Sequence, residues 1–514
     1  MKTRTASIGI AVLIALMIGL GPNTGWCAET ARQPRGIILL IGDGMGINQI
    51  RSAAVYAKEV LGKTLIVDSI VTRGITTTHS ANSEVTDSAA AATAMYSGHK
   101  VVSEVINVLP DGRKVFGIGH AAKNAGLSVG VVSTTRLTHA TPAALYGHAS
   151  NRDQENLIAD QLPAFSPEVA MGGGLRHFLP RDRQGSTRSD GRNLVDDMIA
   201  KGYRYVTNGA ELASVDPAGT DKLLGLFADS HMAYELDRGN VPELGNQPSL
   251  ADMTRFALAT LGRNPNGFFV MIEGGRIDHA CHSHDIKASI HDTIAFDDAV
   301  RVALEYQKAH SDVLVVVTAD HETGGLGLGR GTEYALDMKA LGPITNSTEY
   351  LSRRAKREPD KLDRIVQAGG FDLTDRERAF LSKHPAGTKA SSVQELRGYG
   401  KRIDKYLFSW MHYALGAIAS ERAKVGWTAF VHTAQPVITF AAGPGEEEFA
   451  GSYDNTDMAL RMAKLLRLAL DPPAAESSRK SNVRSSMGIC GTPTEGASHV
   501  RKKGSRGVNH FTAR

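Results

Sequence analysis

The sequence is poor in cysteine and has no long apolar run. Its 514 residues include three cysteines, so a disulfide framework does not hold the fold together. The longest apolar run near the start, residues 8–20, is shorter than the roughly 20 residues that a membrane-spanning helix needs. With 42% hydrophobic and 22% charged residues, the chain is not wholly disordered, collagen-like or a coiled coil.

An excess of one charge is also lacking over most of the chain. The net charge is +4, but residues 473–514 carry +6 and residues 1–28 carry +2, so residues 29–472 carry −4. The body of the chain therefore gives no reason to expect nucleic-acid binding. We predict a basic, disordered tail at 473–514 and no nucleic-acid partner, with nucleic-acid binding through that tail as an alternative.

The first 28 residues have the features of a secretory signal peptide. Lys2 and Arg4 precede the apolar run, and the expected cut follows Ala28. We therefore predict a signal peptide at 1–28 and export to the periplasm or the extracellular space. We expect no stable membrane association after the signal is removed; a membrane anchor is the alternative.

Short apolar runs alternate with helical patterns, which predicts a mostly parallel sheet covered by helices on both faces. The predicted strands are residues 36–41, 128–132, 267–272, 313–318 and 437–441, and the predicted helices include 114–125 and 249–262. Residues 331–425 have no strong strand pattern and are predicted to be helical at 350–368 and 392–419. We predict an α/β core formed by 29–330 and 426–472, with a helical insertion at 331–425.

Ligands bind at the carboxyl ends of the strands in such sheets, so the residues that follow each strand are informative. After the first predicted strand, residues 42–46 read Gly-Asp-Gly-Met-Gly. This spacing differs from the G-x-G-x-x-G of dinucleotide folds, and the acid would repel a pyrophosphate. A carboxylate on a glycine turn instead favours a metal ligand, Asp43.

A second polar cluster follows the predicted strand 267–272. Asp278 and His282 are four residues apart, which places both side chains on one face if they lie in a helical turn. Carboxylate and imidazole together form a zinc ligand set. A solvated polar loop is the alternative.

Further ligands come from two later segments. Asp320 and His321 follow the predicted strand 313–318, and His432 precedes the strand 437–441. With Asp43, Asp278 and His282 they make six ligands, which is enough for two zinc sites of three protein ligands each with positions left open for substrate. Two-metal sites of this kind clamp the attacking and leaving oxygens of a phosphoryl group.

A candidate nucleophile lies in the segment 85–93. An alanine-rich helix is predicted to begin near Ser88, where its free N–H groups and dipole favour an anion. The alternative is that Ser88 simply caps this helix.

These motifs resemble those of the alkaline phosphatase family in type and in order. Residues 85–93 match the family's active-site signature, with the nucleophilic serine at Ser88. The segments around Asp43, 273–282, 320–321 and His432 resemble its metal-binding segments. Residues 138–145 with His148 and Arg152, and residues 172–178, resemble further family segments.

The resemblance implies a three-layer α/β fold and hydrolysis of phosphate monoesters through a covalent phosphoserine at Ser88. It also implies that Arg152 grips two phosphate oxygens. It implies two zinc ions and one magnesium ion per chain: one zinc on Asp43, Asp320 and His321, the other on Asp278, His282 and His432, and the magnesium on Asp43, Thr141 and Glu273. A homodimer is expected because the family is usually dimeric.

His139 and His279 stand at two positions that vary within the family. The enteric bacterial form has Asp and Lys there, whereas this chain has His at both, as in the vertebrate type. Because the imidazole of His139 can coordinate a metal, zinc is the alternative to magnesium at the third site. Because His279 does not carry a full positive charge at alkaline pH, phosphate is expected to bind more weakly and leave faster.

Other functions remain as alternatives at this point. A related metal hydrolase would act on phosphodiesters or phosphonates, and an exported metal- or phosphate-binding protein would use the same ligands without needing Ser88. The insertion 331–425 either covers the mouth of the active site or forms a dimer contact.

Overall fold

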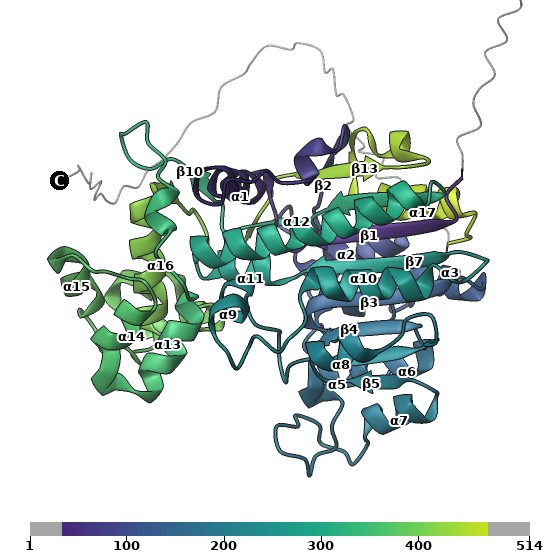
Figure 1. Cartoon of the computed structure of the whole chain (residues 1–514), viewed down its shortest axis with the longest axis horizontal. Helices are drawn as coiled ribbons and strands as arrows, with labels where there is room; N and C mark the ends of the chain where they lie inside the picture. Colours follow the sequence, from purple (N-terminus) through teal and green to yellow (C-terminus); the bar gives the residue numbers. More distant parts are fainter. Residues whose placement is uncertain (1–32, 471–514) are drawn as a thin grey trace, which may run out of the picture. The chain divides into compact units, whose positions relative to one another are not determined.

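A ten-stranded β-sheet organises residues 33–470, which are the residues that this computed structural model describes (Figure 1). Across the sheet the strands follow the order β14 (Gly451–Asp454), β2 (Thr72–Thr77), β13 (Val437–Ala442), β8 (Val313–Thr318), β1 (Gly36–Gly42), β7 (Phe268–Gly274), β3 (Ser128–Arg136), β4 (Val169–Gly173), β6 (Leu223–Leu226) and β5 (Arg204–Val206). Within this sheet only β13 runs antiparallel to its neighbours, β2 and β8. The mostly parallel α/β sheet expected from the sequence is confirmed.

The strand β1 is buried along its whole length and alternates its side chains between two hydrophobic cores. Ile38 and Leu40 belong to one core, while Ile37, Leu39 and Ile41 belong to the other. Residues of α1 (Ile47–Val60), α10 (Leu250–Leu261) and α12 (Ile286–Ala309) pack in the first core. Residues of α2 (Ser88–Ser97), α3 (Ile118–Asn124) and α17 (Asn455–Leu466) pack in the second. The sheet is therefore the middle of three layers.

Shorter elements connect the strands of the sheet. Short helices are α4 (Ala140–Ala143), α5 (Glu155–Ala159), α6 (Leu162–Phe165), α7 (Leu194–Ala200), α8 (Gly209–Ser214), α9 (Glu235–Asn240) and α11 (Arg276–His282). Two small antiparallel pairs join β9 (Glu322–Thr323) to β12 (His432–Thr433) and β10 (Gly327–Leu328) to β11 (Val425–Gly426). The β9–β12 pair holds His432 opposite Thr323, just beyond the end of β8.

Some of the predicted helices are confirmed and others begin or end elsewhere. The predicted helix 249–262 is α10. The Ser249 hydroxyl caps it by accepting a hydrogen bond from the N–H of Asp252, and the Asp252 carboxylate accepts one from the N–H of Ser249. The predicted helix 114–125 begins only at Ile118, because Lys114 pairs with Val108 in an isolated β-bridge.

The region 331–425 contains α13 (Thr348–Arg357), α14 (Leu362–Ala368), α15 (Asp375–Leu381) and α16 (Trp410–Ala423), grouped at one side of Figure 1. The predicted helix 350–368 is split in two, since Pro359 disfavours helical backbone in the residue before it. Residues 394–399 and 401–405 form 3₁₀ turns instead of a helix, separated by Gly400 at φ +62°.

Buried carboxylates of the core hold the start of α13. Asp237 accepts hydrogen bonds from the backbone N–H and the hydroxyl of Ser347, and Asp285 accepts them from those of Thr348. The helix is thereby fixed to the core at its first turn. Among residues 33–470, none of the helices combines the length and apolar character needed to cross a bilayer. The predicted signal at 1–28 and tail at 473–514 lie outside the described residues.

The start of β7 offers a test of the fold. Gly267 has φ +102°, and a Cβ there would lie 1.8 Å from the carbonyl oxygen of Arg35. We expect Gly267→Ala to lower the free energy of unfolding by about 2–4 kcal/mol, because a clash adds to the unfavourable backbone conformation. Gly112→Ala is the control, because Gly112 has φ +85° and its added Cβ would have no atom within 4 Å. It isolates the backbone contribution and should lower the free energy of unfolding by about 1 kcal/mol. Urea unfolding measures both variants, and equal losses of stability would contradict the clash at Gly267.

Candidate metal centre and active site

Three neighbouring strands deliver polar side chains to one edge of the sheet. The strand β1 is paired with β7 on one side and β8 on the other, and all three run parallel. Their carboxyl ends therefore meet, and each is followed by predicted ligands: Asp43 after β1, α11 after β7, and Asp320 after β8. The site arises from strand order, which brings together segments that are far apart in the sequence.

The first group of ligands contains Asp43, Asp320 and His321, all with no exposed surface. The Nε2 atom of His321 lies 3.5 Å from Asp43 Oδ1 and 3.1 Å from Asp320 Oδ2. The carboxylates raise the pKa of His321 although burial opposes them. Two carboxylates and an imidazole converge on one point, which is the donor set that zinc takes.

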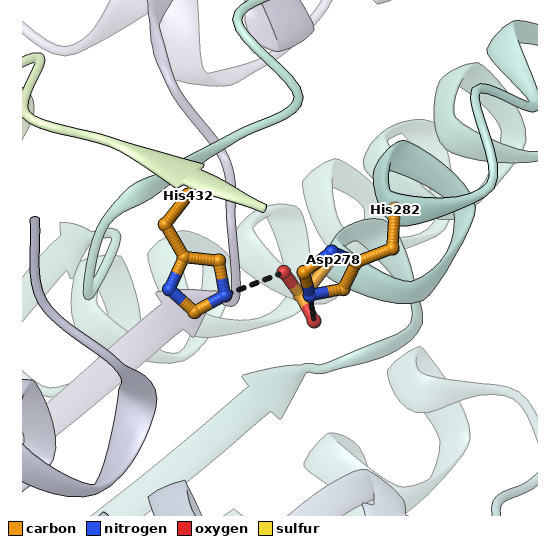
Figure 2. A group of neighbouring side chains, drawn as sticks. All are labelled: Asp278, His282 and His432. Atoms are coloured by element: carbon orange, nitrogen blue, oxygen red, sulfur yellow. Dashed lines mark ion pairs between the residues drawn. The ribbon is translucent and has the colours of Figure 1, made fainter. Parts of the chain in front are cut away.

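The second group contains Asp278, His282 and His432, drawn in Figure 2. Nε2 of His282 lies 3.2 Å from Asp278 Oδ2, and Nε2 of His432 lies 3.6 Å from Asp278 Oδ1. Asp278 and His282 lie in α11, so the predicted helical turn is confirmed and the solvated loop is wrong.

Backbone carbonyls orient both histidines of this second group. Nδ1 of His282 lies 2.6 Å from the Phe430 carbonyl, and Nδ1 of His432 lies 2.7 Å from the Thr86 carbonyl. Because a carbonyl oxygen can only accept, each ring donates its Nδ1 proton there, and Nε2 faces Asp278. Both imidazoles are thus oriented so that Nε2 can coordinate a cation.

A third group contains Asp43, His139 and Glu273. Within residues 33–470, several buried polar atoms here have no hydrogen-bond partner: both oxygens of Asp43, Glu273 Oε1, His139 Nδ1 and Thr141 Oγ1. Burial raises the pKa of Asp43 well above its ordinary value, and nearby carboxylates raise it further. Orphaned oxygens are costly without a partner, and a bound cation satisfies them, so these residues fit a metal.

The helix α2 begins at Ser88, but Ser88 does not cap it. The cap is Asp87, whose Oδ1 accepts a hydrogen bond of 3.1 Å from the N–H of Ala90. The alternative role of Ser88 as the helix cap is therefore wrong. Its hydroxyl instead lies 3.1 Å from Nε2 of His321, at the first metal-ligand group.

Arg152 is held beside Ser88 by the same aspartate. One guanidinium nitrogen donates to Asp87 Oδ2 at 2.9 Å, and another lies 3.0 Å from His139 Nε2. Burial raises the pKa of Asp87, but the charge of Arg152 and the hydrogen bonds from Arg152 and from the N–H groups of Glu104 and Ala90 together outweigh it, so the pKa is lowered. Arg152 and Ser88 line the same cavity, so the guanidinium is placed to bind an oxyanion there.

His279 lies in a cluster of three histidines with His139 and His231. Its ring is 5.5 Å from that of His139 and 4.2 Å from that of His231, and its Nδ1 lies 3.0 Å from Arg276. Burial, with the charge of Arg276, lowers the pKa of His279 to about 3. The side chain is therefore neutral at neutral and alkaline pH.

Sequence reasoning missed several residues of the site. His231 is an isolated histidine in the sequence, and no motif marks it. Arg276 lies two residues before Asp278 in α11, and its spacing of three from His279 is the only clue in the sequence. Tyr406 of the insertion stacks on His282 with ring centres 4.2 Å apart, and nothing in the sequence connects these two residues.

The site opens into a cavity of about 600 Å³. Core residues Ser88, Arg152, His279 and His432 line it, and so do insertion residues Glu349, Arg353, Arg402, Lys405, Tyr406 and Phe408. Of the two roles left open for the insertion, the cavity lining favours cover of the active-site mouth.

Comparisons with known proteins agree on one family. The family model described as alkaline phosphatase matches residues 34–468. The alkaline phosphatase 3 of Bacillus subtilis is 33% identical over 84% of this chain and 89% of that protein. The solved Thermus thermophilus alkaline phosphatase is 30% identical, with a TM-score of 0.74, over 89% of this chain and 98% of that one. A magnesium-bound variant of TAB5 alkaline phosphatase is 26% identical, with a TM-score of 0.60, over 85% of this chain and 99% of that one.

The hydroxyl of Thr323 provides a test of the metal centre. It donates to Asp278 Oδ1 at 2.6 Å and lies 3.2 Å from His321 Nδ1, so it orients one ligand of each of the first two groups. With zinc as the probe metal, we expect Thr323→Val to weaken metal binding by about 10–100-fold, because the shape is kept and the orienting bond is lost. Thr323→Ser should bind the probe metal as the parent does. Competition with a chromophoric chelator measures both, and equal affinities for the valine and serine variants would count against this role.

Proposed function

The chain belongs to the alkaline phosphatase family, and from that premise we propose that Ser88 is the nucleophile and that the three ligand groups are its metal sites. As a family member the chain is a metal-dependent hydrolase of phosphate monoesters. The observation that carries the proposal is the position of the Ser88 hydroxyl, 3.1 Å from a ligand of the first group and at the start of α2.

We assign two zinc ions and a third ion to these groups. One zinc would be held by Asp43, Asp320 and His321, and the other by Asp278, His282 and His432. Magnesium would be held by Asp43, Thr141 and Glu273, whose oxygens suit that ion; zinc is the alternative there because His139 belongs to the same group. When bound, such ions lower the pKa of coordinated oxygens and neutralise charge on a phosphoryl group.

In the first step, Ser88 Oγ attacks the phosphorus of the substrate. A bond forms between Oγ and phosphorus as the hydroxyl gives up its proton, the bond to the alcohol oxygen breaks, and that oxygen takes up a proton and leaves as the alcohol. Arg152 binds two phosphoryl oxygens, and its hydrogen bond to Asp87 keeps it in place. The free N–H groups at the start of α2 add a favourable dipole for the phosphoryl charge.

In the second step, water attacks the phosphoserine and Ser88 Oγ leaves, which regenerates the free enzyme and releases inorganic phosphate. The serine is 1% exposed, so bulk water reaches it only through the cavity. His279 is neutral and lies among His139, His231 and Arg276, so it adds no charge that would retain the product.

Three further predictions from the sequence remain proposals. We propose that the chain is exported, that it forms a homodimer, and that it has no nucleic-acid partner. Their support is the signal-like segment 1–28, the usual assembly of the family, and the negative charge of residues 29–472. The domain boundaries at 330, 425 and 472 likewise remain predictions.

The role of the nucleophile is tested by Ser88→Ala. We expect turnover of p-nitrophenyl phosphate to fall by at least about 10³-fold, because no other group replaces the attacking oxygen. Zinc content should stay at the parent level, since Ser88 is not in a ligand group. Ser97→Ala, in the same helix with its hydroxyl bonded to the Thr93 carbonyl, is the matched control and should keep its turnover. A metal- or phosphate-binding protein without catalysis would show no difference between these variants.

The proposal for product release is tested by His279→Lys. A lysine ammonium adds a positive charge beside the site of phosphate, so inorganic phosphate should inhibit the variant more strongly and limit its turnover. Inhibition constants for phosphate are compared with those of the parent across alkaline pH. Inhibition that is unchanged or weaker in the variant would reject the proposal.

A further inference from the structure

The cavity has a second group of positive side chains besides Arg152. Arg353, Arg402 and Lys405 come from the insertion and line the cavity. Arg402 and Lys405 lie three residues apart in the 3₁₀ turn η7 (Lys401–Lys405), where side chains at that spacing are eclipsed. Both are exposed, and within residues 33–470 neither has an ion pair or a side-chain hydrogen bond.

Local carboxylates leave this group positive. Asp404, between the two cations, turns its carboxylate to the N–H and hydroxyl of Ser391, at 2.8 and 2.6 Å. Glu349 is shared between two guanidiniums, with Arg353 at 3.0 Å and Arg276 at 3.1 Å. One carboxylate shared by two arginines leaves a surplus positive charge.

Of the three cations, Arg353 is held in place by several contacts. Arg353 also lies over the ring of Phe408, with its guanidinium carbon 4.3 Å from the ring centre. The helix α13, which carries Glu349 and Arg353, is fixed to the core at Ser347 and Thr348. His412 adds no charge to this wall, because burial lowers its pKa to about 4.

Tyr406 connects the cationic group to the reaction centre. Its ring stacks on the proposed metal ligand His282, and it follows Lys405 directly in the chain. Tyr406 lines the same cavity as Arg152, Arg402 and Lys405, so the cationic group and the reaction centre share one space.

The core side of the cavity is the less favourable one for a second anion. Glu104 and Asp153 line it there, and both are exposed. The core arginines Arg136 and Arg276 also line the cavity, but each is already paired with a carboxylate, Glu155 and Glu349. A substrate whose phosphate lies at Arg152 would therefore have its other charged end repelled from Glu104 and Asp153 and attracted to the insertion.

We propose that Arg402 and Lys405, with Arg353 beside them, form a subsite for a second anionic group on the alcohol part of the substrate. The enzyme then favours phosphate monoesters whose leaving alcohol carries a further phosphate or carboxylate. This inference rests on the proposed role of Ser88 and Arg152 in binding the reacting phosphate.

The test uses pairs of substrates that differ in one charged group. Alkanediol bisphosphates of increasing chain length are compared with the corresponding hydroxyalkyl monophosphates, and kcat/KM is measured for each with the zinc-loaded full chain. Two equivalent phosphates alone raise kcat/KM by about twofold on statistical grounds. At the chain lengths that span the cavity, the parent should show a higher kcat/KM for the bisphosphate than this statistical advantage gives. The preference should shrink as salt is added, because exposed charges are screened.

Substitution isolates the two cations. In the double variant Arg402→Gln/Lys405→Gln, the ratio of bisphosphate to monophosphate kcat/KM should fall by about three- to tenfold. Lys401→Gln is the matched control, because Lys401 is an exposed cation of the same turn that does not line the cavity, and it should leave the ratio unchanged. Zinc content of each variant verifies that the fold and metal centre are intact.

The outcomes separate this inference from the proposed function. A parent that cleaves monophosphates but shows the same ratio as the double variant at every chain length overturns the subsite alone. An equal fall in the Lys401→Gln control also overturns it, since the effect would then be general charge. A zinc-loaded parent that cleaves neither substrate overturns the proposed function instead.

Discussion

The repulsion among buried carboxylates is the constraint on which the rest of this site depends. Asp43, Glu273, Asp278 and Asp320 are all buried, and the ligand atoms within each group lie within 4.8 Å of one another. Two like unit charges about 4 Å apart repel by about 4 kcal/mol at an effective dielectric constant of 20, so the folded chain carries a large electrostatic cost here. Bound cations reverse that cost, which is why metal binding and the stability of this edge of the sheet are inseparable.

The sheet makes it possible to keep such groups together. The strands β1, β7 and β8 are paired in register and buried on both faces, so their apolar side chains stabilise an edge that is electrostatically unfavourable. His282 and His432 are oriented by hydrogen bonds that they donate to the backbone carbonyls of Phe430 and Thr86, which lie in loops. Rigid strands thus set the positions of the ligands, while loops set their orientations.

The sequence predicted the parts of the structure that are encoded in contiguous segments. The strand 313–318 matches β8 residue for residue, and all six proposed zinc ligands and Ser88 lie together at one edge. Residues whose role arises only from tertiary packing were missed, such as His231 beside His279 and Tyr406 on His282. The strands β4, β5 and β6 were missed because they are short, and β4 and β6 also contain glycine. The helix expected at 392–419 failed in its first half because Gly400 adopts a positive φ.

The divided carboxylate of Asp87 has a consequence for how this enzyme can evolve. One oxygen caps the N-terminus of α2, next to the nucleophile. The other accepts a hydrogen bond from the guanidinium of Arg152. A substitution that removes both oxygens, such as Asp87→Ala, therefore removes the cap of α2 and the anchor of Arg152 together. Laboratory evolution that seeks larger substrates by relocating Arg152 through position 87 is thus limited to residues that still cap a helix, such as Asn or Ser.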